Sequence, residues 1–253
     1  MYTPAELEEI KWSSIPENIV VFDTETTGLN PSKDHILEIG AVKFNKTDYR
    51  ANGEIDTFQA FIKQENPIPH SATKINGITD EIVKDGDTEI EAINKFLDFV
   101  DDYPLYAYNQ EFDMGFLFAA SKRNGIDRGL SELACTDLLD FSRKNLDLPN
   151  YRLGTVCEYL EISSSGQHRA VNDSLMSLQL FIKLTQHLVA RDTGRAMVAL
   201  EELKAETEKL EKALKARQAK EMDEKNQSLK TVAIMIFIGI GIVSAFFLTA
   251  MSK

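Results

Sequence analysis

Short apolar runs separated by polar turns characterise the chain as far as His187. Asn18–Phe22 (NIVVF) is a continuous apolar run that ends in an acidic turn, as expected of a buried strand. Ile36–Phe44 and Phe58–Ile62 are further strand candidates, and Leu105–Tyr108 is a fourth. We expect these segments to be strands of one central sheet.

Segments with helical character alternate with these strands. Glu89–Val100 suits an amphipathic helix, and Phe112–Asn124 suits a helix that ends before a glycine. Leu153–Leu160 and Ala170–Leu188 complete the pattern as helices. This mixed order predicts an α/β domain over residues 1–188, with a central sheet flanked by helices.

The composition changes between Ala199 and Lys230, where eight acidic and eight basic residues occur without Gly or Pro. Leucines recur there at Leu200, Leu203, Leu210 and Leu214, at spacings of three and four residues when Thr207 fills the gap in the register. One interpretation of residues 189–230 is a solvated helical stalk. The other is a short coiled coil that joins two copies of the chain into a homodimer.

Residues 231–251 are predicted to form one transmembrane helix. The twenty residues from Val232 to Met251 carry no charge, and at the helical rise they span roughly 30 Å, the thickness of a bilayer's hydrocarbon core. Four cations precede the span and one follows it: Arg217, Lys220, Lys225, Lys230 and Lys253. This asymmetry predicts a single-pass C-terminal membrane anchor, in the inner membrane if the source is bacterial, with the preceding domain in the cytoplasm.

The overall charge and the cysteines narrow the function classes. A net charge of −12 argues against a broad, non-specific nucleic-acid binder, which would carry a basic face. It leaves open an enzyme that holds nucleic acid locally through bound metal ions. Cys135 and Cys157 are too few for a disulfide framework or a zinc site, so we expect a reducing compartment. The N-terminal residues MYTPAELEEIKW lack an apolar run, and we expect no secretory signal.

Asp23 and Glu25 are the first candidate functional residues. They stand two residues apart at the end of the first strand candidate, so both carboxylates project from one face if the strand continues. Two adjacent carboxylates repel each other by roughly 1 kcal/mol in water at 4 Å, and by more in a drier site. Divalent cations, which prefer oxygen ligands, offset this repulsion. Taken alone, the pair is better explained as a polar turn with two surface acids.

Two later segments also carry acids. Asn109 is expected to N-cap the helix that follows it, and Asp113 lies in that helix beside its apolar face. Asp113 needs a partner because burying an unpaired charge is costly, and a salt bridge would serve. His168 follows a Ser/Gly-rich loop, and Asp173 lies in the first turn of the last helix, where an acid ordinarily serves the helix dipole. Each segment by itself is weak support for a functional site.

Taken together, the three segments form an ordered pattern. Asp-x-Glu on a first strand is followed about ninety residues later by Asn-x-x-Phe-Asp, and then by His-x-Ala-x-x-Asp before the last helix. On these motifs the chain from Pro16 to His187 resembles the DEDD superfamily of 3′–5′ exonucleases. The histidine in the third motif is typical of the DEDDh subtype, which includes the proofreading epsilon subunit of bacterial DNA polymerase. The resemblance implies a ribonuclease H-like fold with a mixed central sheet.

The resemblance also implies the site residues. Two divalent metal ions, Mg²⁺ or Mn²⁺, would be held by the carboxylates of Asp23, Glu25, Asp113 and Asp173. His168 would be the general base, because an imidazole titrates near neutral pH and can take a proton from the attacking water. The residues expected to meet the terminal nucleotide are Thr24, Glu25, Thr26, Asn76 and His168. Asn76 departs from the family pattern, since many relatives have His there.

The predicted function is therefore metal-dependent removal of nucleoside 5′-monophosphates from the 3′ ends of nucleic acid, with DNA favoured, by a membrane-anchored enzyme. The acidic net charge favours single-stranded or frayed ends, because few phosphate contacts are available for a long duplex. A 3′–5′ exoribonuclease is an alternative in the same class. A catalytically silent, membrane-tethered scaffold that binds nucleic acid is an alternative from another class, because a fold can outlast its chemistry.

Overall fold

The computed structural model describes residues 3–126, 128–130, 133–163 and 168–250. Beyond residue 210, side chains are described only at residues 212, 215, 220, 222, 223 and 227. The chain divides into two compact units, Met1–Asp192 and Thr193–Lys253. The first unit carries the sheet and every candidate site residue.

Five strands form one mixed sheet in the order β3-β2-β1-β4-β5. They are β1 (Asn18–Thr26), β2 (Ile36–Asn45), β3 (Asp56–Phe61), β4 (Leu105–Ala107) and β5 (Cys135–Asp137). β2 is antiparallel to both β1 and β3, whereas β4 is parallel to both β1 and β5. The prediction of a mixed central sheet flanked by helices is confirmed.

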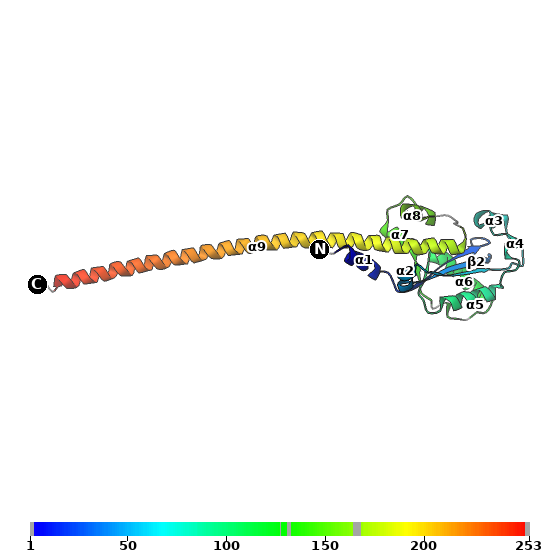
Figure 1. The fold of residues 1–253 in the computed structure, drawn as a ribbon, viewed down its shortest axis with the longest axis horizontal. Helices are drawn as coiled ribbons and strands as arrows, with labels where there is room; N and C mark the ends of the chain where they lie inside the picture. Colours follow the sequence, from blue (N-terminus) through cyan, green and yellow to red (C-terminus); the bar gives the residue numbers. More distant parts are fainter. Residues whose placement is uncertain (1–2, 127, 131–132, 164–167, 251–253) are drawn as a thin grey trace. The chain divides into compact units, whose positions relative to one another are not determined.

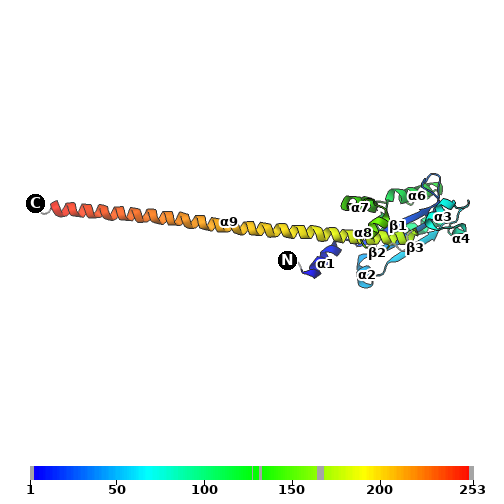
Figure 2. The same ribbon diagram turned by 90° about the horizontal axis from the view of Figure 1, so that it is seen from above.

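Helices cover both faces of this sheet. The described helices are α1 (Pro4–Ser13), α2 (Lys46–Asn52), α3 (His70–Asn76), α4 (Asp80–Val83), α5 (Glu89–Val100), α6 (Gln110–Arg123), α7 (Leu138–Asn145), α8 (Leu153–Tyr159) and α9 (Ala170–Ala250). Figure 1 shows α5 and α6 on one face, and α7, α8 and the first turns of α9 on the other. The view from above in Figure 2 shows the first turns of α9 lying over the strands.

The side chains of β1 feed both layers of the core. Val20 and Phe22 pack in the cluster that includes α5 and α6. Ile19 and Val21 pack in the cluster that includes α7 and α9. Successive side chains of a strand point to opposite faces, so a strand covered on both faces must be apolar throughout. This explains the continuous apolar run at the start of β1.

Local signals predicted the longer elements better than the short ones. The helix predicted at Glu89–Val100 has the same bounds in the structure, where Thr88 and Glu91 form a capping box at its start. The prediction that the Asn109 side chain caps α6 is wrong. Its φ of 68° is left-handed instead of extended, and only its carbonyl accepts a bond, from the N–H of Phe112 at 3.0 Å.

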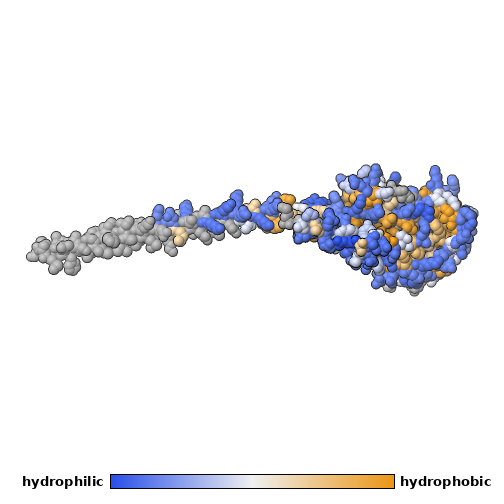
Figure 3. Space-filling model, in the orientation of Figure 1, coloured by the Kyte–Doolittle hydropathy of each residue, from blue (hydrophilic) through white to orange (hydrophobic). Residues whose placement is uncertain are grey.

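The second unit contains the continuation of helix α9. Apolar side chains are exposed there, including those of Leu200, Leu203 and Leu210. Figure 3 shows hydrophilic residues over most of its described surface, with apolar ones among them. The predicted stalk boundaries, 189–230, and the homodimer through that stalk stay predictions.

The prediction of a transmembrane helix at residues 231–251 is corrected. Within the part of the chain that the structure describes, no helix has both the length and the apolar content to cross a bilayer. In the described part of α9 in the second unit, acids and bases interrupt the apolar positions, and each would be costly inside a bilayer. Residues 231–250 continue the helix, and their side chains lie outside the described ones.

The localisation that depended on this helix is corrected with it. A single-pass membrane anchor with the domain in the cytoplasm, and a lipid bilayer as partner, were inferred from hydropathy and flanking charge alone. Because no described helix could span a membrane, neither has support in the structure.

Candidate active site

The end of strand β1 distributes its polar side chains between the two layers. Asp23 and Glu25 continue the face of Val21, which is covered by α9, and Thr24 continues the opposite face. The strand register agrees, since Asp23 lies opposite Gly40 and Glu25 opposite Glu38 on β2. Both carboxylates therefore share the face that meets the start of α9.

Gly40 allows the first turn of α9 to approach the sheet at this point. A Cβ on Gly40 would lie 2.2 Å from the backbone N of Val171 and 2.3 Å from the carbonyl carbon of Ala170, distances that no side chain tolerates. The hydroxyl of Ser174 donates to the carbonyl of Gly40 at 3.0 Å. Asp173, next to Ser174, is thereby held close to the end of β1.

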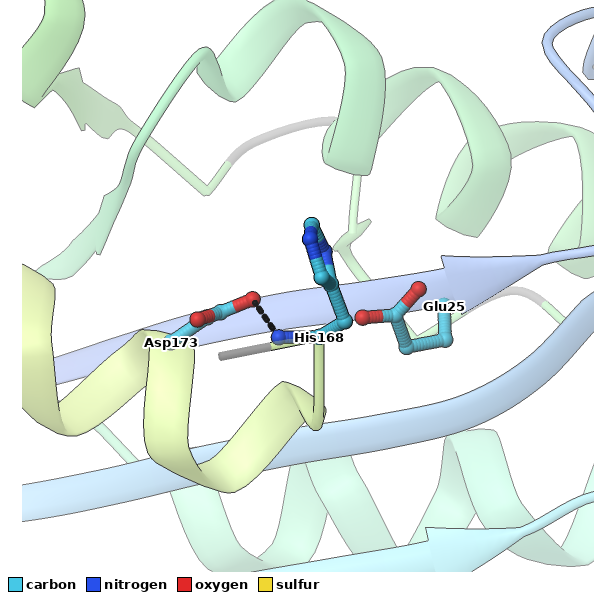
Figure 4. Close-up of side chains that lie close together, drawn as sticks. All are labelled: Glu25, His168 and Asp173. Carbon is cyan, nitrogen blue, oxygen red and sulfur yellow. Dashed lines mark hydrogen bonds between the residues drawn. The ribbon is translucent and has the colours of Figure 1, made fainter. Parts of the chain in front are cut away.

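His168 lies just before α9 and completes a three-residue cluster. Its N–H donates to Oδ2 of Asp173 at 3.1 Å, and its φ of 69° is left-handed. Figure 4 shows the side chains of Glu25, His168 and Asp173 meeting from β1, from the loop before α9 and from its first turn. One ligand atom from each lies within 4.8 Å of the others.

Asp113 reaches the site from α6, on the other face of the sheet. Its side chain is buried, and its Oδ1 accepts bonds from the N–H of Thr24 at 2.9 Å and from the hydroxyl of Thr24 at 2.7 Å. The partner that a buried acid needs is therefore Thr24 and not a salt bridge. These bonds hold Asp113 beside the end of β1, where its charge acts on Asp23.

The predicted nucleotide-binding residues lie around Glu25. The buried Asn76 accepts a bond from the N–H of Ile78 at 3.0 Å and donates to the carbonyl of Thr26 at 3.5 Å. The hydroxyl of Thr26 donates to the carbonyl of Gly28 at 2.6 Å. The Thr24 and Thr26 hydroxyls are thus donated within the protein, and their roles toward a nucleotide stay predictions.

Glu38 is a buried acid beside the site that sequence reasoning missed. It is 0% exposed and accepts bonds from Gln59 Nε2 at 2.5 Å, from Arg169 Nε at 3.2 Å and from the N–H of Ala170 at 3.4 Å. Because donors already occupy both oxygens, Glu38 differs from the candidate metal ligands. An acid within the apolar run Ile36–Phe44 was the available signal, since a buried charge requires partners.

Burial and mutual repulsion raise the pKa of the two acids on β1. Burial raises the pKa of Asp23 well above its usual range, and the charges of Asp113, Asp173 and Glu25 raise it further. Burial, followed by the charge of Asp173, raises the pKa of Glu25 to about 8. These two carboxylates therefore resist ionising together when no cation is bound.

The two acids contributed by helices are perturbed in the same direction. Burial raises the pKa of Asp113 to about 7, although its hydrogen bonds from Thr24 act to lower it. Burial raises the pKa of Asp173 to about 6, although the N–H and the charge of His168 act to lower it. Such clusters of perturbed acids are typical of functional sites.

The residues present fit divalent cations. Oδ1 of Asp173 is buried and has no hydrogen-bond partner among the described residues, so one lone pair of the site is left to a ligand. The four carboxylates Asp23, Glu25, Asp113 and Asp173 offer oxygen ligands, which hard cations such as Mg²⁺ and Mn²⁺ prefer. A bound cation would also offset the repulsion that raises their pKa values.

A groove of about 740 Å³ lies beside His168. Its lining includes the exposed Arg152, the hydroxyl-bearing Thr155 and Glu158 of α8. The groove therefore carries both a cation, Arg152, and an acid, Glu158, beside His168.

Comparison with known sequences identifies the same family as the sequence motifs. The exonuclease family of RNase T matches residues 20–181, a range that includes every predicted site residue. The PolC-type DNA polymerase III of Caldanaerobacter subterraneus subsp. tengcongensis is 37% identical over 177 residues, 70% of this chain and 12% of that protein. The PolC-type DNA polymerase III of Bacillus subtilis is 34% identical over 170 residues, 66% of this chain and 11% of that protein. The chain thus spans 11–12% of the length of these curated relatives.

Solved structures share the fold. The complex of E. coli ExoI with single-stranded DNA, in its zinc-bound form, aligns with a TM-score of 0.60 at 19% identity, over 68% of this chain and 41% of that chain. The nuclease domain of 3′hExo, a DEDDh family member bound to rAMP, aligns with a TM-score of 0.58 at 18% identity, over 68% of this chain and 92% of that chain. These likenesses establish the fold alone. Because the family match covers most of the chain, the chain belongs to the DEDD-type exonuclease family.

Proposed function

We propose that the chain is a divalent-metal-dependent 3′–5′ exonuclease that releases nucleoside 5′-monophosphates from single-stranded or frayed 3′ ends, with DNA favoured. One observation carries this proposal. Asp23, Glu25, Asp113 and Asp173 come from one strand and two helices, yet their charges raise the pKa values of Asp23 and Glu25, and Glu25 and Asp173 lie beside His168. Gathering repelling acids has no structural benefit, so the cluster points to a bound cation.

The four carboxylates would hold two Mg²⁺ or Mn²⁺ ions. Bound there, the ions would lower the pKa of a water and neutralise the charge that develops on the phosphate oxygens. His168 would accept the proton of the attacking water at an imidazole nitrogen. Its exposed position on the loop before α9 gives the imidazole access to solvent and to a substrate phosphate.

Other residues would position these groups and the substrate. Thr24 holds Asp113 by two bonds, and the N–H of His168 holds Asp173 by another. Thr26, Asn76, and the main chain around Thr24 would meet the terminal nucleotide, as the family resemblance implies. Fixed placement of reacting groups lowers the entropy cost of reaching the transition state.

The preference for DNA is supported by the relatives. The PolC-type proteins are named as DNA polymerases, and the ExoI structure is a complex with single-stranded DNA. The 3′hExo nuclease domain is bound to rAMP, a ribonucleotide, and this keeps an exoribonuclease as the second candidate. A silent nucleic-acid-binding scaffold is the candidate from another class.

A panel of oligonucleotides labelled at their internucleotide phosphates tests the proposal. Matched DNA and RNA strands, each with a free or a blocked 3′ end, are incubated with the full chain and Mn²⁺. We expect mononucleotide release from free 3′ ends, faster on DNA, and no release with EDTA or from the Asp113→Asn variant. Asp85→Asn, which changes an exposed acid of the same kind, should be as active as the wild type.

Each result has a distinct meaning. Faster release from RNA would overturn the DNA preference and favour the exoribonuclease. Release from blocked 3′ ends would overturn the 3′–5′ direction. Binding without release at any metal or pH would favour the scaffold.

A further inference from the structure

Arg169 and Glu38 form an ion pair between the start of α9 and strand β2. Arg169 donates from Nε to Oε2 of Glu38 at 3.2 Å and from Nη2 to Oε1 at 3.4 Å, a two-point contact. Glu38 is fully buried, whereas the Arg169 side chain is 39% exposed. A planar guanidinium bound at two points restrains orientation as well as distance, which a point charge does not.

A second contact fixes the same guanidinium from the side. Its carbon lies 5.1 Å from the ring centre of Phe61 on β3, within the range of a cation–π contact. Phe61 is the register partner of Glu38, so both groups belong to adjacent strands on one face of the sheet. Arg169 is therefore held by two adjacent strands of the sheet.

These contacts anchor three consecutive residues at the point where the loop becomes α9. The N–H of His168 donates to Asp173, Arg169 pairs with Glu38, and the N–H of Ala170 donates to Glu38 at 3.4 Å. His168 also adopts a left-handed φ of 69°, a conformation that non-glycine residues adopt at a cost. Such a conformation persists only where neighbouring contacts impose it.

We propose that the Arg169–Glu38 pair is a positioning device for His168. Arg169 follows His168 directly, so clamping its guanidinium on β2 and β3 fixes the peptide from which the imidazole projects. The inference rests on the proposed function, because it assigns His168 the role of general base. Arg169 itself would touch neither the substrate nor the acids of the metal cluster.

The geometry separates this role from two simpler ones. If Arg169 only neutralised Glu38, any cation at that position would suffice. If Arg169 bound a substrate phosphate, its donors would face the open site. Instead, Nε and Nη2 are both directed at a buried carboxylate.

Arg169→Lys carries the test, because lysine keeps a charge for Glu38 but cannot bind it at two points. Arg169→Ala would strand a buried carboxylate and lower stability, so it serves only as a folding comparison. We expect Arg169→Lys to lower kcat about tenfold or more, a part of the roughly 100- to 10,000-fold that a general base contributes. KM should stay at its wild-type value.

Three further measurements complete the design. His168→Ala, Arg169→Lys and the double variant form a cycle in which Arg169→Lys should have little effect once His168 is absent. Hydrogen exchange of the segment 168–173 should be faster in Arg169→Lys, independently of activity. Arg128→Lys, which alters an exposed Arg128–Asp98 pair at the far end of α5, should change none of these quantities.

Four outcomes would overturn the inference. A wild-type kcat in Arg169→Lys would show that residue 169 needs only a positive charge and not a two-point contact with Glu38. A raised KM would make Arg169 a substrate contact, and additive losses in the cycle would remove the link to His168. Unchanged hydrogen exchange in the segment 168–173 would show that the clamp does not hold it. Release by the wild type is measured in the same assay, so its absence would count against the proposed function and not against the clamp alone.

Discussion

At the residue scale, a single threonine connects the acids of strand β1 with the acid that helix α6 contributes from the other face of the sheet. Thr24 is the residue of β1 that points away from Asp23 and Glu25, and it donates twice to Asp113 on α6. The hydroxyl bond favours the ionised form of Asp113 and so acts to lower its pKa. Thr24 therefore influences both the position and the charge of an acid that is distant in sequence.

Thr24→Val tests this link with little change of shape. Loss of the hydroxyl leaves a buried carboxylate oxygen with one donor fewer, which we expect to lower the free energy of unfolding by about 1.5–3 kcal/mol. The pKa of Asp113 should rise further, so the acid limb of the activity–pH profile should move to higher pH. Thr47→Val, which removes an exposed hydroxyl bond to Glu17, is the matched control and should alter neither. An unmoved acid limb in Thr24→Val would contradict the link.

Asp23→Asn separates stability from activity. In the metal-free protein the charged Asp23 is repelled by its neighbours, which helps to hold its pKa well above the usual range. Removing that charge should raise the melting temperature of the metal-free protein above neutral pH while activity falls by at least about 100-fold, a trade-off typical of active sites. Thermal melts in EDTA and the exonuclease assay check the two parts. A lower melting temperature would mean that Asp23 stabilises the fold and is not strained there.

At the scale of elements, the site depends on how closely α9 lies over β2. The approach is possible because Gly40 has no side chain, and Ser174 then bonds to its carbonyl. Asp173 and the Arg169–Glu38 pair both belong to this junction. A small displacement of the helix would therefore move several candidate functional groups together.

Gly40→Ala should disrupt this junction. The new methyl group would collide with the backbone of Ala170 and Val171, and overpacking of this kind costs about 1–3 kcal/mol or more. We expect a lower melting temperature and a loss of Mn²⁺ affinity, because Asp173 would move away from Asp23. Gly115→Ala is the control: its methyl group would meet only Pro31 Cγ at 3.8 Å, and alanine favours the helix. Equal behaviour of the two variants would show that the junction is not tight.

At the scale of the whole molecule, the acid cluster ties stability to pH and to metal. The pKa values of Asp173, Asp113 and Glu25 are raised to about 6, about 7 and about 8, from usual values of 3.8, 3.8 and 4.5. Between the usual and the raised pKa values of these acids, the folded chain binds more protons than the unfolded chain. The stability of the fold therefore falls as pH rises through this range. Above about pH 8 the penalty from these three acids is fully present, and below about pH 4 it is absent.

Thermal melts of the full chain in EDTA should show this dependence. One pKa unit corresponds to about 1.4 kcal/mol, and each kcal/mol shifts the melting temperature by about 2–4 °C in a chain of this size. We therefore expect the melting temperature to fall by at least about 5 °C between pH 5.5 and pH 8.5, and Mg²⁺ to restore most of it at pH 8.5. The Asp23→Asn variant should show a smaller fall. A flat profile without metal would contradict the raised pKa values.

Sequence patterns predicted the elements whose signals are local and long. The apolar run of β1 and the amphipathic helix Glu89–Val100 are found where they were expected. The strand Cys135–Asp137 was missed because its sequence, Cys-Thr-Asp, contains no apolar run of the kind that indicated the equally short β4. The apolar stretch at 231–251 was interpreted as membrane-spanning from hydropathy alone, and no described helix can span a bilayer.

By itself, the sequence determined the identity and order of the acids Asp23, Glu25, Asp113 and Asp173, the nearby histidine, and the alternation of strands and helices that leads to an exonuclease fold. Only the tertiary structure decided how those acids are held. The Thr24–Asp113 bond joins residues 89 apart, and the Glu38–Arg169 pair joins residues 131 apart. The physical reason is that periodicity and capping are encoded within a few neighbouring residues. Contacts over such separations exist only once the sheet and its covering helices bring the partners together.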